Sequence, residues 1–332
     1  MGTLLKSVLI SLFTLAVCLA GKAFSTPLAH KDGFTPEEPR VVTVGKLKVK
    51  YVESGRGPAV VLLHGNAGGI EDFEYGMVQD LARDHRVIAI DRPGHGGSDR
   101  PEKEASVEFQ AQLLHETLAD LGVTQPVIVG HSWGGSLALC YALEYPSDVA
   151  GLVLLAPAAY PDDHAHILLR AFTRTPLLSN LSIAIGKTLF GHLLIKQNLD
   201  DAFYPQKVPS SYLKIAARTW LGDKQLRAYL EDQLLLNDCL RKIKDRYAEI
   251  KLPVVIITGD KDKVVVPKDN AYRLQRDIPG SRIIELKDTG HEIPMTRPES
   301  IYAAMDLIAD HSGATANTVA VGGSPSPPTS TY

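Results

Sequence analysis

The fold is decided by the stretch VIVGHSWGGSLAL at residues 127–139. It begins as an apolar run of strand character and continues into small residues that are compatible with a helix. Ser132 lies between Gly130 and Gly134, and Gly135 follows. Glycine lacks the Cβ that would clash where a strand turns tightly into a helix. The spacing Gly-x-Ser-x-Gly therefore predicts a nucleophile elbow, a strained turn that lifts a serine hydroxyl above the end of a sheet.

Short runs rich in Val, Ile and Leu recur on both sides of this stretch. They read PAVVLLHG, HRVIAIDRPG, PVIVGHS, VAGLVLLAP, LPVVIITG and SRIIELKD. Runs that are nearly all apolar are typical of central strands covered on both faces. Helical patterns lie between or after them, at residues 73–83, 106–121, 133–145, 267–277 and 298–310. Residues 40–55 predict a hairpin that turns at Gly45 and Lys46. The alternation predicts an α/β fold with a mostly parallel, doubly wound sheet.

Residues 160–250 break this alternation, because they show helical periodicity without a convincing strand. The part at residues 175–195, TPLLSNLSIAIGKTLFGHLLI, is strongly apolar, but polar residues and Lys187 interrupt it too often for a membrane span. A packed helical hairpin would explain the pattern. A cap over a pocket is favoured, because active sites of open α/β sheets form where the strands end. We therefore expect a core formed by residues 36–159 and 251–312, with a helical cap at 160–250 inserted between its two parts.

The two ends of the chain differ from this core in composition. Near the N-terminus, Lys6 precedes an uncharged apolar stretch at residues 7–21, which small residues follow. Residues 1–25 therefore predict a signal peptide, cleaved after Ala20 or Ala23, or an uncleaved membrane anchor. We expect the protein to be exported, as a secreted or periplasmic protein, or to be anchored to a membrane. Residues 313–332 are rich in Gly, Pro, Ser and Thr, which predicts a disordered tail.

The composition of the chain limits the classes of function it can have and the roles its cysteines can take. The chain has 332 residues, of which 45% are hydrophobic, so it can bury a large core. A net charge of −3 without a long basic run gives nucleic-acid binding no electrostatic support. The three cysteines show no metal-ligand spacing. Cys18 lies in the N-terminal apolar run, so the one possible disulfide joins Cys140 and Cys239. We expect these two to be buried free thiols.

A serine nucleophile needs a base, an orienting acid and donors for an oxyanion. Each has a candidate past a strand end, in the chain order Ser, Asp, His. His291 follows the last strand in DTGHEIPMTRPE, and Asp262 follows the preceding strand in TGDKDKVVVP. LLHGNAGG ends the first central strand, so the backbone N–H groups of Asn66 and Trp133 are candidates for the oxyanion hole. Asp260 follows the same strand as Asp262. The third residue after Gly259 turns back toward the histidine more easily, which favours Asp262.

Other histidines and glycine-rich stretches have structural explanations. His64, His95 and His131 adjoin glycines at strand ends, so we expect them to make loop hydrogen bonds. We assign RPGHGGSDRP mainly to loop geometry, with Asp91 and His95 as structural hydrogen-bonding residues. The chain lacks the metal motif His-Glu-x-x-His, and no Gly-Lys-Ser/Thr follows HGNAGG, so this loop is not a phosphate-binding loop.

Together these motifs, in a region from about residue 41 to 308, resemble the α/β-hydrolase family. The similarity is to the branch with caps like those of epoxide hydrolases and haloalkane dehalogenases. It implies Ser132 as nucleophile, His291 as base, an acid after the seventh strand, and no cofactor. The family's Gly-x-x-Asp falls on Gly259 and Asp262. Some relatives keep the acid after the sixth strand, which here would be Asp162 or Asp163.

One departure from that branch bears on the reaction. Epoxide hydrolases and haloalkane dehalogenases carry Asp at the elbow, whereas this chain has Ser132. An acyl-enzyme intermediate follows, as in esterases and lipases. We expect hydrolysis of carboxylic esters with an apolar portion, acting on a small-molecule or lipid-like ester. A carbon–carbon bond hydrolase with the same triad is the alternative enzyme. A non-catalytic binding protein on a hydrolase fold is the alternative from another class.

Overall fold

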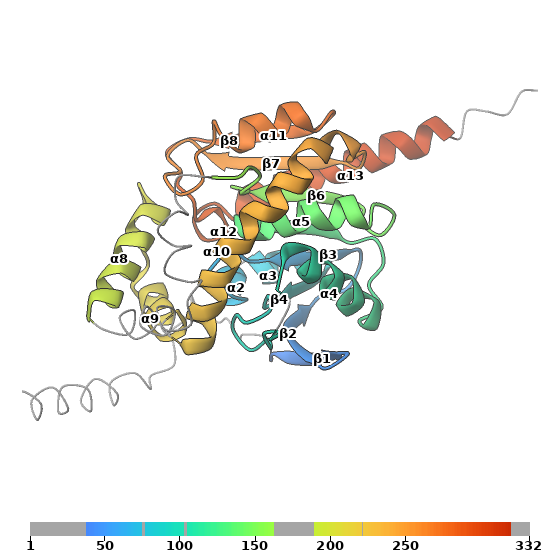
Figure 1. Cartoon of the computed structure of the whole chain (residues 1–332). Coiled ribbons are helices and arrows are strands. Elements are labelled where there is room, and N and C mark those ends of the chain that lie inside the picture. Colours follow the sequence, from blue (N-terminus) through green and yellow to red (C-terminus); the bar gives the residue numbers. More distant parts are fainter. Residues whose placement is uncertain (1–37, 75–76, 103–104, 163–188, 221, 320–332) are drawn as a thin grey trace, which may run out of the picture. The chain divides into compact units, whose positions relative to one another are not determined.

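A computed structural model of the chain describes residues 38–74, 77–102, 105–162, 189–220 and 222–319 (Figure 1). Within these residues, eight strands form one sheet in the order β1-β2-β4-β3-β5-β6-β7-β8. The strands are β1 (Arg40–Val44), β2 (Leu47–Ser54), β3 (Ala59–Leu63), β4 (Arg86–Ile90), β5 (Val127–His131), β6 (Gly151–Leu155), β7 (Val254–Gly259) and β8 (Arg282–Leu286).

The strand directions confirm the predicted sheet. β1 and β2 form an antiparallel hairpin in which Val44 pairs with Leu47, and Gly45 takes a positive φ of 58° in the turn between them. β2 is also antiparallel to β4. The remaining pairs, from β4 through β3, β5, β6 and β7 to β8, are parallel. Parallel neighbours require crossover connections, and the helices that make them cover both faces.

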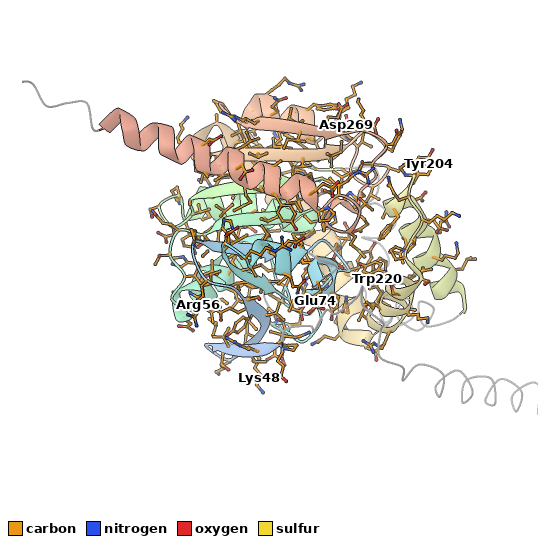
Figure 2. All side chains as sticks on the ribbon, turned by 180° about the vertical axis from the view of Figure 1, so that it is seen from behind. Lys48, Arg56, Glu74, Tyr204, Trp220 and Asp269 are labelled. Carbon is orange, nitrogen blue, oxygen red and sulfur yellow. The ribbon has the colours of Figure 1, made fainter. Side chains whose placement is uncertain are left out.

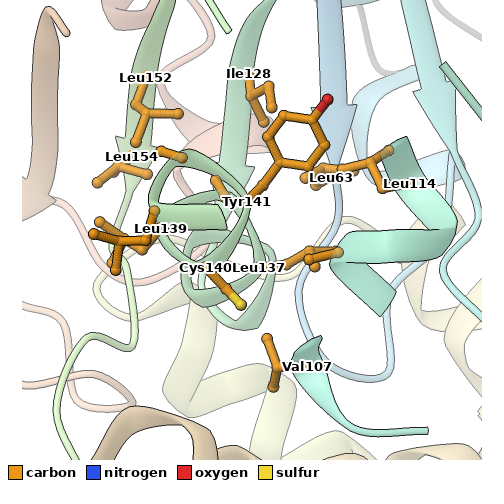
Figure 3. Packing of buried hydrophobic residues seen from close by; sticks show 14 of the residues in the cluster. Leu63, Val107, Leu114, Ile128, Leu137, Leu139, Cys140, Tyr141, Leu152 and Leu154 are labelled. Carbon is orange, nitrogen blue, oxygen red and sulfur yellow. The ribbon is translucent and has the colours of Figure 1, made fainter. Parts of the chain in front are cut away.

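Two apolar layers cover the two faces of the sheet. Each strand contributes to both layers, because successive side chains of a strand point to opposite faces. Val61 and Leu63 of β3 pack with α4 (Val107–Asp120), α5 (Trp133–Glu144) and α11 (Ala271–Asp277). Val60 and Leu62 pack with α2 (Glu71–Glu74), α3 (Met77–Leu81), α12 (Ile293–Thr296) and α13 (Glu299–Val319). Figure 3 shows the first layer around α5, where Cys140 lies among apolar side chains. The sheet is therefore doubly wound, as predicted.

The insertion between β6 and β7 is helical in its described part. It contains α8 (Leu189–Phe203), α9 (Ser210–Thr219), α10 (Asp223–Ile243) and a 3-10 helix, η1 (Lys244–Glu249). Figure 2, seen from behind, shows Tyr204 after α8 and Trp220 after α9 on the same side of the molecule. Residues 163–188 lie outside the described residues, and they include most of the apolar run at 175–195.

The end of this insertion belongs to the core rather than to a cap. Leu236, Leu240 and Ile243 of α10 and Tyr247 of η1 are buried in the same apolar layer as α5. These side chains recur on one face of the helix, which packs against α4 and α5, so the cap predicted to end at residue 250 gives way to core packing within α10. Cys140 and Cys239 are buried free thiols, as expected.

The C-terminal prediction needs a correction. α13 continues to Val319, so the expectation of a disordered tail is wrong for residues 313–319. Ala314 and Ala316 favour a helix, and the first proline of the tail, Pro325, comes later. Residues 320–332 and the predicted signal or anchor at 1–25 lie outside the described residues. Among the helices that the structure describes, none combines the length and the apolar character that crossing a membrane requires.

Candidate active site

Ser132 occupies a strained turn between β5 and α5, as the glycine spacing predicts. Its φ of 53° and ψ of −115° lie in a region that non-glycine residues rarely adopt. Three backbone hydrogen bonds hold the turn. The Ser132 N–H donates to the Leu155 carbonyl at 2.8 Å, and the Ser132 carbonyl accepts from Gly135 at 3.0 Å and Ala158 at 3.2 Å. The end of β6 and the residues that follow it therefore hold the elbow in place.

Two glycines of the elbow are needed because backbone approaches them closely. A Cβ on Gly130 would overlap the Gly134 carbonyl oxygen, and a Cβ on Gly134 would overlap the carbonyl oxygen of Leu63. The start of α5 thus lies directly against the end of β3. This contact sets Ser132 beside the loop that follows β3, where a Cβ on Gly65 would lie 3.3 Å from the Ser132 Cβ.

His291 and Asp262 form a hydrogen-bonded pair at the ends of neighbouring strands. The His291 Nδ1 lies 2.8 Å from the Asp262 Oδ2, and both side chains are buried. The other oxygen of Asp262, Oδ1, accepts from the N–H groups of Val264 at 2.8 Å and Val265 at 2.9 Å. Both carboxylate oxygens are thus occupied, which fixes the carboxylate plane against the imidazole.

The backbone of His291 is held from two sides. Its N–H donates to the Ala202 carbonyl in α8 at 2.8 Å, and the His131 Nε2 lies 3.0 Å from its carbonyl oxygen. Burial disfavours the imidazolium, but the charge and hydrogen bond of Asp262, with the charge of Glu292, outweigh it and raise the pKa of His291. An imidazole with a carboxylate behind Nδ1 suits a group that takes up a proton at Nε2.

The other described candidates for the acid that orients His291, Asp260 and Asp162, have different partners. The Asp260 Oδ1 accepts a long hydrogen bond of 3.4 Å from the Thr289 N–H, and its other oxygen pairs with Lys261. The backbone of Asp162 exchanges hydrogen bonds with the Asn237 side chain at 3.1 and 2.7 Å. Of Asp162, Asp260 and Asp262, all in the described part of the chain, the structure brings Asp262 to the imidazole. Asp163 lies outside the described residues.

Of the two candidate oxyanion residues, Trp133 directly follows Ser132, and Asn66 belongs to the loop after β3 whose Gly65 lies beside Ser132. Asn66 follows β3, and its side chain is tied down, with Oδ1 accepting from the Ala67 N–H at 3.1 Å and Nδ2 donating to the Tyr229 carbonyl at 3.2 Å. Ala67 has a positive φ of 63°, which bends the chain directly after Asn66. Trp133 is the first residue of α5, so its N–H has no acceptor inside the helix. The loop after β3 and the start of α5 can thus present two amides to one oxygen.

His64, directly after β3, and Asp91, directly after β4, make structural hydrogen bonds, as predicted. The His64 Nδ1 lies 2.8 Å from the Gly65 carbonyl, and its Nε2 accepts from the Arg92 N–H at 2.9 Å. Burial and the nearby Arg92 charge keep the pKa of His64 low. Asp91 accepts from the N–H groups of Ile70 at 3.0 Å and Gly97 at 2.9 Å.

Sequence reasoning missed a buried ionic cluster beside this site. Arg92 and Asp232 are fully buried and pair at 2.7 Å. The stretch that contains Arg92 predicts only loop geometry, and no motif marks Asp232. A signal existed in the sequence, because Asp232 falls at helical spacing with Ala228 and Leu236 on the buried face of α10.

Comparison with known proteins agrees with the fold and the motif pattern. A family model described as alpha/beta hydrolase fold matches residues 58–298. The chain therefore belongs to the α/β-hydrolase family. A solved α/β-hydrolase fold protein from Burkholderia ambifaria superposes with a TM-score of 0.69 at 24% identity, and the match covers 80% of this chain and 96% of that one. At this identity the likeness shows the fold.

Two curated relatives carry names of hydrolases. Lipase 1 of Psychrobacter immobilis is 29% identical over 283 residues, which cover 80% of this chain and 79% of the lipase. A hydrolase of Burkholderia vietnamiensis, named for 2-hydroxy-6-oxononadienedioate and 2-hydroxy-6-oxononatrienedioate, is 29% identical over 279 residues, covering 79% and 91%. The chain is thus similar both to a named lipase and to a hydrolase of another substrate class.

Proposed function

We propose that the protein is a serine hydrolase that cleaves carboxylic esters with an apolar portion through an acyl-enzyme. The observation that carries the proposal is the combination of Ser132 on a strained elbow and His291 held at 2.8 Å by Asp262. A strained serine with a carboxylate-oriented histidine at the neighbouring strand ends is the arrangement that acyl transfer uses. The oxyanion donors are the backbone amides of Asn66 and Trp133.

The reaction proceeds in two halves. His291 takes the proton of Ser132 as the hydroxyl attacks the ester carbonyl, and the two amides stabilise the oxyanion that forms. His291 then gives the proton to the leaving alcohol, which leaves an acyl-enzyme on Ser132. A water molecule gives a proton to the same imidazole as it attacks the acyl group. The bond from the acyl carbon to the Ser132 Oγ then breaks, His291 returns the proton to Oγ, and the acid is released. The Asp262 carboxylate holds the imidazole in place and stabilises the imidazolium in both halves.

Two features favour an ester with an apolar portion as substrate. The insertion between β6 and β7 carries the apolar run at residues 175–195, which is suited to contact an acyl chain. The similarity to Lipase 1 of Psychrobacter immobilis points in the same direction. The relative from Burkholderia vietnamiensis favours a second candidate, hydrolysis of a carbon–carbon bond beside a carbonyl, which the same three side chains can catalyse.

A panel of p-nitrophenyl esters from acetate to palmitate, assayed beside a Ser132→Ala variant, tests the proposal. We expect turnover that depends on acyl length and a loss of roughly 10⁶-fold in the variant, as in well-studied triads. Cleavage of a 2-hydroxy-6-oxo-dienoate but of no ester would favour the carbon–carbon hydrolase. Ester turnover within tenfold of wild type in folded, purified Ser132→Ala would remove Ser132 from the mechanism.

We also propose that residues 1–25 direct export or anchor the protein to a membrane. Lys6 followed by an apolar stretch is the basis, and no candidate site residue precedes Asn66. A chain that begins at Thr26 should therefore remain active. Cell fractionation with N-terminal sequencing tests the proposal. A full-length protein that stays in the cytoplasm with Met1 or Gly2 at its N-terminus would contradict it.

A further inference from the structure

We propose that Asp232 on α10 is a positioning residue for the oxyanion hole, because it holds Arg92, which fixes the amide of Asn66 and the ring of Trp133. This inference rests on the proposed hydrolase function and deepens it. Asp232 lies in the segment inserted between β6 and β7, about 100 residues after the elbow in sequence. The insertion would then contribute to the chemistry of the site as well as to its covering.

Asp232 is a fully buried carboxylate whose two oxygens are both occupied. Its Oδ2 accepts from the Arg92 Nη1 at 2.7 Å and lies 3.1 Å from the His95 Nε2. Its Oδ1 accepts from the Arg100 Nη1 at 2.7 Å and from the Gln110 Nε2 at 3.2 Å. Burial alone would raise the pKa of Asp232, but Arg92, His95 and Arg100 outweigh it and hold the pKa well below its usual value. The carboxylate is therefore ionised and anchors Arg92 in one geometry.

Arg92 connects Asp232 to the loop after β3. Its Nη2 donates to the Gly65 carbonyl at 3.0 Å, and its Nε donates to the His64 carbonyl at 3.1 Å. The Gly65 carbonyl and the Asn66 N–H belong to one planar peptide group, in which they point in opposite directions. Fixing the carbonyl therefore fixes the direction of the Asn66 N–H. A cation bound to the carbonyl also polarises the peptide and strengthens its N–H as a donor.

The same ion pair reaches the second oxyanion residue. The guanidinium carbon of Arg92 lies 3.9 Å from the centre of the Trp133 ring, a cation–π contact. The Trp133 Nε1–H donates to the backbone carbonyl of Asp232 at 3.3 Å. Trp133 is thus held between Arg92 and α10 at the first turn of α5. One buried ion pair thus contacts Trp133 and the carbonyl of the peptide group that carries the Asn66 N–H.

The test compares Asp232→Asn with Asn237→Ala on the same helix. Asn237 is also buried and bonds to the backbone of Asp162, away from the loop after β3, so its replacement controls for general loss of stability. For Asp232→Asn we expect kcat on a p-nitrophenyl ester to fall about 10- to 100-fold with KM within about threefold, because misplaced donors weaken transition-state binding. Phenylboronic acid, which forms a tetrahedral adduct with an active-site serine, should inhibit more weakly by a similar factor. Asn237→Ala should change neither quantity.

A charge-conserving variant covers the case in which Asp232→Asn does not fold. Arg92→Lys keeps a cation beside Asp232, but an ammonium cannot reach both the His64 and Gly65 carbonyls as the guanidinium fork does. It should lower kcat about tenfold or more with KM little changed. Folded Arg92→Lys or Asp232→Asn with wild-type kcat and boronate inhibition would overturn the inference, while loss of activity in Ser132→Ala would leave the proposed function standing. Full activity in Ser132→Ala would instead contradict the proposed function itself.

Discussion

Asp262→Asn replaces the carboxylate behind His291 with an amide of the same shape, and the surrounding donors decide which way that amide faces. The Asp262 Oδ1 accepts from two backbone N–H groups, those of Val264 and Val265. The amide oxygen must therefore take the Oδ1 position, which turns the NH₂ group toward the His291 Nδ1. A donor at this place requires Nδ1 to accept, so the imidazole proton moves to Nε2. His291 then presents a proton where it should receive one from Ser132.

The expected loss in kcat is about 10⁴-fold, the effect of the same change in a well-studied serine protease, which corresponds to about 5 kcal/mol of barrier. Initial rates on p-nitrophenyl butyrate measure it, with thermal unfolding as the check that the variant folds. Asp260→Asn is the matched control, because Asp260 bonds to Thr289 and Lys261 and should lose less than about threefold. A folded Asp262→Asn that keeps kcat within tenfold, or an Asp260→Asn that loses more, would refute the assignment of the acid.

Three further outcomes follow from the same geometry. Gly134→Ala should lower Tm by several degrees or prevent folding, because the new Cβ overlaps the Leu63 carbonyl oxygen; a thermal melt measures this, and an unchanged Tm would contradict the close approach. The acid limb of kcat/KM against pH should have its midpoint above the usual pKa of a histidine, because Asp262 raises the pKa of His291 and the base acts when neutral; a midpoint at or below that usual value would contradict this sign. Asp162→Asn should keep kcat within about threefold in the same ester assay, and a loss of a hundredfold would restore Asp162 as the acid.

Local patterns allowed most of the core to be predicted from the sequence. Valine- and isoleucine-rich runs mark strands that are covered on both faces, and the hairpin turn at Gly45 needs only its own neighbours. The elbow could be predicted because close backbone contacts at Gly130 and Gly134 exclude a side chain. Asp262 was preferred over Asp260 from loop length, and the structure brings Asp262 to His291.

The features that were not predicted depend on contacts between distant parts of the chain. Asp232 contacts Arg92 across 140 positions, and nothing adjacent to either residue in the sequence indicates that they meet. Likewise, the end of α10 packs into the core beside α4 and α5 through Leu240 and Ile243. The amphipathic pattern alone does not predict this, since a cap helix has the same periodicity. The composition of residues 313–332 does not reveal the helix at 313–319, because the prolines that set that composition lie nearer the end of the segment.

The proposed mechanism requires that Ser132 becomes covalently acylated with the help of His291. Intact-protein mass spectrometry after treatment with a fluorophosphonate, followed by peptide mapping, tests this role of Ser132. We expect one stoichiometric adduct on the peptide that contains Ser132 in the folded wild type, and a rate of labelling reduced by orders of magnitude in His291→Ala. Folded wild-type protein that remains unlabelled at Ser132, or His291→Ala that is labelled at the wild-type rate, would contradict the account.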